Sequence, residues 1–392
     1  MGRLTRREAI RLTFAATMLP LFQSEPARRG VIFLPGIMGS TLRVKGSSRE
    51  IELWSKDAWQ TYRLLATAPN KLRFIGEPAE SPEIFDQALL GPWPICDYYS
   101  KLIRLLNSSI SFGVGKQVCL IPYDWRRSIV TTAGDCQRSL LGHFGGQQVS
   151  DLFTSASSID QIDVVAHSMG GLIALLLLST PGFPQERVRS LILIAPPVIG
   201  SPRAFRNLFD TVSLPFLDDI VFRWFGKNGG IAVDRLHDVF ATFESLYELM
   251  PPRDVLYINS GLSNSWSNPL SEHSRMRGDM CEKAVATHQL LAKSVSQLAI
   301  PKKRIHLFTG IGVETDNRYH VKQTPSILLH ASPYAMTLKP EVTSGDGTVS
   351  LDSATWHDQL IDRVNHYPIV GGKHSNLCDN REVLEIVEQI LS

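Results

Sequence analysis

The stretch Ala166-His167-Ser168-Met169-Gly170-Gly171 decides the fold. An apolar run that predicts a strand over residues 159–166 leads into it, and an apolar run that predicts a buried helix, Leu172 to Leu178, follows it. A serine between small residues at such a junction has the form of the G-x-S-x-G nucleophile turn, with Ala166 replacing the first glycine. We therefore expect the Ser168 hydroxyl to project from a sheet edge as a nucleophile. An ordinary tight turn is the alternative.

Strands and helices alternate on both sides of this turn. Runs bounded by proline or glycine predict strands over 31–34, 117–121, 159–166, 189–195, 304–310 and 368–370, and helical patterns cover 97–107, 169–179 and 381–391. The alternation predicts an α/β protein with a mostly parallel sheet and helices on both faces. Together with the nucleophile turn, it indicates the α/β-hydrolase fold over residues 30–392.

Two stretches interrupt this alternation. Residues 45–95 are rich in tryptophan, proline and other aromatics, and residues 200–300 carry helical patterns between two core strands. We expect the first to form a lid-type insertion and the second a cap insertion. Both should lie over the carboxyl edge of the sheet, where open α/β sheets bind their ligands.

A serine nucleophile needs a base, and the base needs an orienting acid. In this fold the chain order is serine, acid, histidine, so both partners should follow Ser168. Asp346 is the predicted acid because Gly345 and Gly347 allow a tight turn after a strand. The rival acids Asp316 and Asp352 have no such glycines around them.

The predicted base is His374. It follows the last short strand, in Gly371-Gly372-Lys373-His374, and precedes the C-terminal helical pattern. His357 and His366 come before that strand and are less well placed, while His167 precedes the nucleophile and is expected to pack locally.

Acyl transfer also needs donors for the tetrahedral oxyanion. One donor should be the backbone N–H of Met169, the residue after the nucleophile. The other should come from the loop after the first predicted strand, Pro35-Gly36-Ile37-Met38-Gly39-Ser40. The Ile37 N–H is the predicted second donor, with Met38 as the alternative.

The overall composition limits the partners. Lys and Arg total 40 against 38 Asp and Glu, so the chain lacks the basic excess typical of nucleic-acid binding. A neutral or lipid substrate fits better. The five cysteines include no Cys-x-x-Cys pair, and no ligand cluster implies a metal or another cofactor. We expect unpaired thiols, with one disulfide left open if the protein is exported.

Residues 1–29 have the pattern of a targeting segment. Thr5-Arg6-Arg7-Glu8-Ala9-Ile10-Arg11 resembles a twin-arginine export signal, and an apolar stretch too short to span a bilayer, Leu12 to Phe22, follows it. We expect export or membrane tethering through this leader. The alternative is a disordered basic leader on a cytoplasmic protein.

Several motifs together resemble the lecithin:cholesterol acyltransferase family, which includes phospholipid:diacylglycerol acyltransferases and the lysosomal phospholipase. They are Phe33 to Ser40, Leu53-Trp54, Pro122-Tyr123-Asp124-Trp125-Arg126, Ala166 to Gly170, Ala195-Pro196-Pro197, Gly345 to Val349 and Gly372-Lys373-His374. The Pro-Tyr-Asp-Trp-Arg segment discriminates most, because generic lipases rarely carry it.

The resemblance implies a lipid O-acyltransferase. Such an enzyme moves an acyl chain from a glycerolipid onto its serine and then to an alcohol or to water. A lipase or carboxylesterase that only hydrolyses is the alternative, and a binding module on the same fold is a third reading. The family often ties its lid with a disulfide in the 40–75 region, and this chain has no cysteine there.

A lipid substrate also needs an apolar channel, and lipid-surface association would accompany it. The two insertions carry many large aromatic side chains. Trp224 and Phe225 are the predicted acyl-binding pair, because Gly226 and Gly229-Gly230 follow them and can act as a hinge.

Overall fold

The computed structural model describes residues 29–46, 50–108, 117–140, 160–209, 233–252, 254–258, 261–264, 277–325, 334–356 and 360–392. Trp224, Phe225 and His357, together with residues 1–28 of the predicted leader, lie outside this part of the chain.

The centre of the molecule is a parallel sheet. Its order is β14-β11-β8-β7-β1-β6, and every neighbouring pair is parallel. The strands are β1 (Arg29–Leu34), β6 (Gln117–Leu120), β7 (Gln161–His167), β8 (Val188–Ile194), β11 (Ile305–Ile311) and β14 (Asn365–Val370). Each corresponds to a predicted strand and differs only at its ends. β1 begins at Arg29, whose guanidinium pairs with buried Asp163 of β7 at 3.1 Å.

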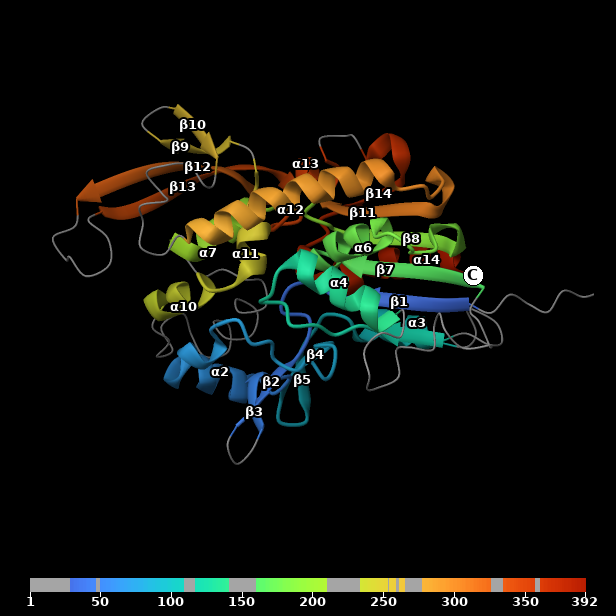
Figure 1. Cartoon of the computed structure of the whole chain (residues 1–392), viewed down its shortest axis with the longest axis horizontal. Helices are drawn as coiled ribbons and strands as arrows, with labels where there is room; N and C mark the ends of the chain where they lie inside the picture. Colours follow the sequence, from blue (N-terminus) through green and yellow to red (C-terminus); the bar gives the residue numbers. More distant parts are fainter. Residues whose placement is uncertain are drawn as a thin grey trace, which may run out of the picture.

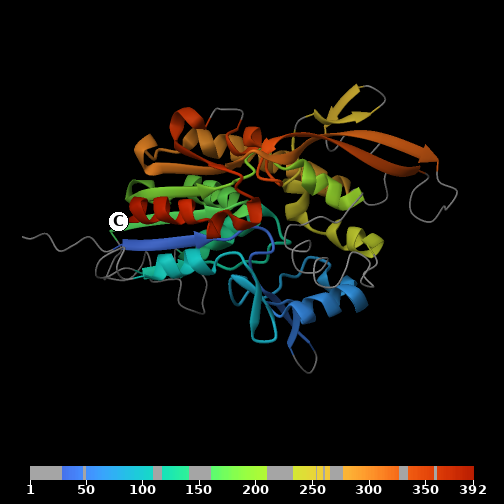
Figure 2. The same cartoon turned by 180° about the vertical axis from the view of Figure 1, so that it is seen from behind.

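Helices cover both faces of this sheet. α6 (Met169–Ser179), α4 (Ile129–Leu140) and α12 (Gly278–Gln297) pack together on one face, and α3 (Ser100–Asn107) and α14 (Arg381–Leu391) lie on the other (Figures 1 and 2). The apolar run of α6 is buried from Met169 to Leu178, as its position between sheet and helices requires. In α14, Val383, Val387 and Leu391 form the buried stripe, and the Asn380 side chain caps its first turn. This is the predicted α/β-hydrolase fold.

The first excursion runs from β1 to α3. It contains β2 (Leu42–Lys45) paired with β3 (Glu50–Trp54), the helix α2 (Ala58–Thr67), and β4 (Gln87–Leu90) paired with β5 (Trp93–Asp97). The stretch predicted as a lid-type insertion is therefore two antiparallel ribbons around one helix. It lies beyond the carboxyl ends of the central strands (Figure 1).

The second excursion follows β8. Its helices are α7 (Pro202–Phe209), α10 (Val233–Phe240) and α11 (Glu244–Glu248). It also holds β9 (Asp254–Ile258) and β10 (Gly261–Asn264), which join β12 (Val313–Pro325) and β13 (Tyr334–Gly345) in a second sheet of order β10-β9-β12-β13. This sheet projects from the body of the molecule (Figures 1 and 2).

The helices expected over residues 200–300 are present, and the same stretch also holds the strands β9 and β10. β9 pairs with its neighbour β10 and, in parallel, with the distant β12. Pairing partners this far along the chain leave no local pattern. The remaining short elements are α13 (Leu351–Ala354) and the 3-10 turns η1 (Pro69–Leu72), η2 (Gln185–Arg187), η4 (Lys302–Arg304), η5 (Ile361–Arg363) and η6 (His374–Asp379).

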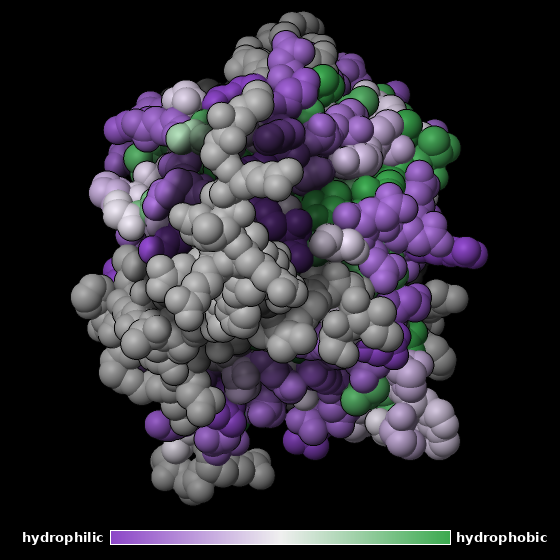
Figure 3. All heavy atoms as spheres, turned by 90° about the vertical axis from the view of Figure 1, so that its right-hand side faces the viewer, coloured by the Kyte–Doolittle hydropathy of each residue, from purple (hydrophilic) through white to green (hydrophobic). Residues whose placement is uncertain are grey.

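The two ends of the sheet differ in character. Figure 3 views the end at which the parallel strands begin, and its coloured residues are mostly hydrophilic, with apolar ones scattered among them. The chain also ends there (Figure 1). The excursions gather at the opposite end, where the strands finish.

Among the described residues, no helix is long and apolar enough to cross a bilayer.

Candidate active site

Ser168 occupies a sharp turn between β7 and α6. Its backbone has φ 53° and ψ −125°, in a left-handed region that residues other than glycine rarely adopt. Two hydrogen bonds hold it there: the Ser168 N–H donates to the Ile194 carbonyl at 2.9 Å, and the Gly171 N–H donates to the Ser168 carbonyl at 2.8 Å. A strained residue held in this way often belongs to a functional site.

The glycine two residues after Ser168 has a steric reason. A Cβ on Gly170 would lie 2.4 Å from the carbonyl oxygens of both Leu34 and Pro35, at the end of β1. The helix can therefore approach the neighbouring strand only if this position is glycine.

His374 connects Ser168 to Asp346. Its Nε2 lies 2.8 Å from the Ser168 Oγ, and its Nδ1 lies 2.7 Å from Asp346 Oδ2. A carboxylate can only accept hydrogen bonds, so the ring proton of His374 is at Nδ1 and Nε2 accepts the serine hydroxyl proton. The three side chains are buried, and they lie in the order that general-base activation of a hydroxyl requires. The structure thus brings together the three residues predicted from the sequence.

Asp346 is itself fixed by its turn. Its second oxygen, Oδ1, accepts the N–H groups of Thr348 at 2.9 Å and of Val349 at 2.7 Å. Gly347 takes φ 88°, which the turn needs. The glycine-framed motif therefore leaves Oδ2 alone to face the histidine.

The rival residues are engaged elsewhere. Asp316 accepts the Tyr319 hydroxyl and pairs with Arg206 on α7. His366 Nε2 lies 2.8 Å from the Thr309 hydroxyl, within the sheet. His167, expected to pack locally, lies against His374, with ring centroids 4.9 Å apart.

The loop after β1 passes beside Ser168. Gly36, Ile37, Met38 and Gly39 line the same pocket as Ser168, and Met38 takes φ 61°. The Gly36 N–H donates to the Tyr99 hydroxyl and the Gly39 N–H to the Gly36 carbonyl, both at 3.0 Å. The N–H groups of Ile37, Met38 and Met169 donate to no group in the described part of the chain. Both candidates for the second oxyanion donor thus remain, together with Met169.

Aromatic side chains hold this loop by its carbonyl groups. Trp54 Nε1–H donates to the Met38 carbonyl at 3.2 Å, and Trp125 Nε1–H to the Ser40 carbonyl at 3.0 Å. The Tyr123 hydroxyl donates to the Pro35 carbonyl at 2.5 Å. Residues of the Leu-Trp and Pro-Tyr-Asp-Trp-Arg motifs therefore meet at this loop, a role that their sequence positions did not reveal.

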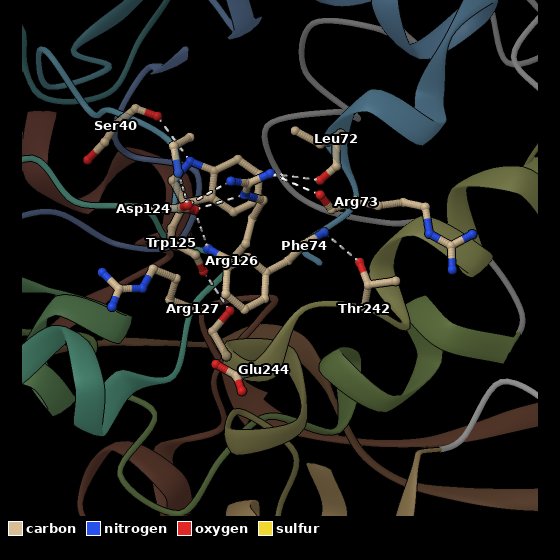
Figure 4. Close-up of polar contacts among 12 residues, drawn as sticks. Ser40, Leu72, Arg73, Phe74, Asp124, Trp125, Arg126, Arg127, Thr242 and Glu244 are labelled. Atoms are coloured by element: carbon tan, nitrogen blue, oxygen red, sulfur yellow. Dashed lines mark hydrogen bonds and ion pairs between the residues drawn. The ribbon is translucent and has the colours of Figure 1, made fainter. Parts of the chain in front are cut away.

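The last residues of the second motif tie the loop region to the excursions. Buried Arg126 makes two hydrogen bonds to the Asp124 carboxylate, at 2.8 and 2.6 Å. It also donates to the carbonyls of Leu72 and Arg73, and Asp124 accepts the Ala79 N–H at 2.8 Å. Figure 4 shows this ion pair between the first excursion and the segment around Glu244.

A pocket opens over Ser168 and His374. Its wall is mostly apolar and draws on both excursions: Phe85 comes from the first, and Ala204, Leu246 and Leu249 come from the second. No group of three or more His, Cys, Asp or Glu in the described ranges could hold a metal ion. All five cysteines lie in the described part of the chain, and none of them forms a disulfide there.

Comparisons with known proteins found one family model and several solved structures that are similar to this chain. A family model described as a PGAP1-like alpha/beta domain matches residues 147–241, which include the Ser168 turn. A protein of the Tle4-Tli4 complex is 15% identical, with a TM-score of 0.51 over 94% of this chain and 99% of that one. The lipase BlEst2 of Bacillus licheniformis is 12% identical, with a TM-score of 0.37 over 95% and 96% of the two chains.

A third structure is the peroxisomal alpha-beta-hydrolase Lpx1 of Saccharomyces cerevisiae, at 13% identity and a TM-score of 0.33 over 94% of this chain and 78% of that one. No curated protein sequence matches the chain. The resemblance to the lecithin:cholesterol acyltransferase family rests on the motifs alone. The chain has the α/β-hydrolase fold, and its Ser168 turn lies within the PGAP1-like match.

Proposed function

We propose that this protein is a serine-dependent acyl-transferring enzyme that acts on lipid esters. Ser168 is the nucleophile, His374 the general base and Asp346 the residue that orients it. The observation that carries the proposal is the unbroken chain of hydrogen bonds from Asp346 through His374 to Ser168, at the floor of an apolar pocket.

The reaction follows from this geometry. His374 Nε2 takes the Ser168 proton while Oγ attacks the ester carbonyl carbon, and the carbonyl oxygen becomes an oxyanion. The N–H groups of Ile37 and Met169 donate to that oxyanion, and the N-terminus of α6 favours its charge. His374 then protonates the departing alcohol, the ester C–O bond breaks, and an acyl-serine remains. A second alcohol or water repeats the sequence and releases Ser168.

The wall of the pocket supports a long acyl chain as the transferred group. An apolar wall from two excursions offers an acyl chain a site out of water, at about 0.8 kcal/mol per buried CH₂. By its motifs, the acyl donor is a glycerophospholipid or another glycerolipid and the acceptor is an alcohol. This is the lecithin:cholesterol acyltransferase type of O-acyltransfer. If water is the acceptor, the same intermediate makes the enzyme a lipase or phospholipase.

Exposed apolar residues on the first excursion support contact with a lipid surface. Trp59 is 50% exposed, Ile75 81% and Trp93 71%. Tryptophan is favoured where a protein meets the lipid–water interface. Export through the leader is part of the same proposal, since it would bring the enzyme to membrane lipids.

A fluorophosphonate probe tests the nucleophile. The probe should label the intact protein at one serine, identified as Ser168 by mass spectrometry of the digest, and Ser168→Ala should not be labelled. Labelling at another serine would reject the assignment.

Radiolabelled phosphatidylcholine tests the acceptor. Incubation with a long-chain alcohol should yield a labelled wax ester, and incubation without it should yield free fatty acid. Free fatty acid alone in both reactions would make the protein a hydrolase.

A further inference from the structure

A second chain of hydrogen bonds runs behind the first. The Gly36 N–H donates to the Tyr99 hydroxyl at 3.0 Å, the Tyr99 oxygen lies 2.8 Å from His167 Nδ1, and His167 Nε2 lies 3.2 Å from the His374 carbonyl oxygen. This chain joins the loop beside Ser168 to the backbone of the general base. None of the roles assigned above uses Tyr99 or His167.

With a neutral His167, only one arrangement of protons satisfies every contact. The His374 carbonyl can only accept, so His167 carries its proton on Nε2. Nδ1 of His167 must then accept, and the Tyr99 O–H is its donor. The Tyr99 oxygen keeps a lone pair for the Gly36 N–H. Each hydrogen bond in the series therefore has one assigned donor and one assigned acceptor.

The series requires a neutral His167. Protonation would place a second N–H on Nδ1, and Tyr99 would lose the acceptor of its hydroxyl proton. Complete burial, together with the neighbouring His374, holds the pKa of His167 well below its ordinary value. Burial likewise raises the pKa of Tyr99, so its hydroxyl keeps its proton. The ring of His167 thus adds no charge beside the general base.

The parts joined by this series are closely packed. A Cβ on Gly36 would meet Ser168 Cβ at 3.0 Å and His167 Nδ1 at 3.1 Å. The backbone N–H of His374 donates to the Asp346 carbonyl at 2.9 Å, so both backbone groups of His374 are fixed. A shift of the loop would therefore move the Ile37 N–H away from the serine without disturbing the bond between Ser168 and His374.

We propose that Tyr99 and His167 are positioning residues that hold the oxyanion loop at a fixed distance from the general base. Tyr99 anchors the loop through Gly36, one residue before the Ile37 N–H, and His167 anchors Tyr99 to His374. The inference rests on the proposed serine mechanism. It adds that the oxyanion donors depend on two side chains that touch no substrate.

The test uses the full-length protein and a p-nitrophenyl ester that the wild type cleaves. Tyr99→Phe removes the hydroxyl that links loop and histidine. We expect kcat to fall about 10- to 100-fold with little change in KM, because misplaced donors weaken only the transition state. His167→Leu should give a similar loss. The double variant should be no worse than the poorer single one, because either change breaks the same series.

Two variants separate positioning from folding. His167→Gln offers one amide donor and one carbonyl acceptor and should recover most of the kcat that His167→Leu loses. Tyr367→Phe is the matched control, because the Tyr367 hydroxyl also contacts a histidine, His306 Nδ1 at 3.2 Å, within the sheet. It should leave kcat unchanged.

A sulfur analogue tests the oxyanion site directly. A thiocarbonyl sulfur accepts hydrogen bonds weakly, so a thionoester depends little on the oxyanion donors. Tyr99→Phe should therefore slow the oxygen ester more than the matching thionoester. Equal losses on both esters, or additive losses in the double variant, would overturn the positioning role. If fluorophosphonate fails to label Ser168 in the wild type, the serine mechanism itself is rejected instead.

Discussion

Nδ1 of His374 lies 2.7 Å from Oδ2 of Asp346, and the His374 backbone N–H donates to the Asp346 carbonyl at 2.9 Å. The acid thus holds both the ring and the backbone of the base. In Asp346→Asn, an amide nitrogen facing Nδ1 would favour the wrong ring tautomer. We expect Asp346→Asn and His374→Ala each to lower kcat by about 10⁴- to 10⁶-fold, and the double variant to lose little more.

The comparison for this prediction is His366→Ala. His366 lies on β14, the strand that precedes the predicted base in the chain. Its side chain contacts Thr309 rather than the serine. Its loss should leave kcat within a few-fold of wild type by steady-state kinetics. If His366→Ala abolishes turnover and His374→Ala does not, the base is misassigned.

Ser168→Ala should abolish turnover and preserve the fold. Within the described residues, the Oγ makes its one side-chain hydrogen bond with His374, so its removal should leave the core packing intact. We expect a loss of about 10⁶-fold in kcat, with an unchanged circular dichroism spectrum. Ser179→Ala, at the far end of the same helix, removes a hydroxyl bonded to Ser294 and should keep full activity. Retained esterase activity in Ser168→Ala would remove the central assignment.

The central sheet and the meeting of Ser168, Asp346 and His374 were predictable because each has a local signal. A parallel strand buried on both faces is a short apolar run, and β7 and β8 both have this form. The turns at Ser168 and Asp346 need small residues or glycines at fixed offsets. Chain order then selects the acid and the base.

The second sheet and the supports of the oxyanion loop were not predictable in this way. β12 and β13 pair in a long hairpin, and β9 joins them by a parallel contact with no local cue. In the sequence, Trp54 and Trp125 have no feature that distinguishes them from other large apolar residues. Only the structure shows that their indole N–H groups donate to carbonyls of the same loop. For His167, the sequence predicted local packing, whereas the ring reaches His374, 207 residues away.

The ion pair of Arg126 and Asp124 predicts a large stability effect. Both side chains are buried, with 2% exposure each. Arg126→Met leaves the Asp124 carboxylate buried without its cation and removes two donors from the carbonyls of the first excursion. We expect a loss of about 3–5 kcal/mol in the free energy of unfolding, measured by urea denaturation.

An exposed arginine supplies the control. Arg381 pairs with Glu385 on the surface of α14, where its side chain is 91% exposed. Arg381→Met should not measurably change the urea midpoint, because water and salt screen such pairs. A similar loss of stability in both variants would mean that the buried pair of Arg126 and Asp124 contributes no more than an exposed pair.

Glu248 predicts a pH-dependent stability. Burial raises its pKa to about 7, although Ser128, Ile129 and Thr287 donate to its carboxylate. Between the ordinary pKa of 4.5 and about 7, the folded state binds a proton that the unfolded state releases. The free energy of unfolding should therefore fall as the pH rises through this window, by roughly 3 kcal/mol at most.

Glu248→Gln removes that dependence. Both hydroxyl partners can rotate to accept from the amide, so the variant should fold. His288 changes the stability in the opposite direction, because burial lowers its pKa to about 4. Its contribution to the free energy of unfolding rises with pH up to about 6.5. The free energy of unfolding is measured for wild type and Glu248→Gln at pH 5 and at pH 8. The difference between the two proteins isolates the contribution of the glutamate. The wild type should lose more stability over that interval, and parallel curves would contradict the prediction.

The position of Ala204 in the pocket predicts that the size of its side chain controls which acyl chain lengths the enzyme accepts. It lies on α7, lines the pocket over Ser168 and is only 5% exposed, beside the apolar wall formed by Leu246 and Leu249. Ala204→Phe places a ring in the space proposed for the acyl chain, while the bonds among Ser168, His374 and Asp346 stay in place. A long acyl group then has to compete with the ring for the pocket, but a short one does not. We expect kcat/KM on p-nitrophenyl palmitate to fall at least about tenfold, equivalent to roughly 1.4 kcal/mol, and p-nitrophenyl butyrate to change much less. The ratio of the two rates in one preparation cancels any loss of folded protein. An equal fall on both esters would place the acyl chain elsewhere, and the apolar pocket would no longer support a lipid substrate.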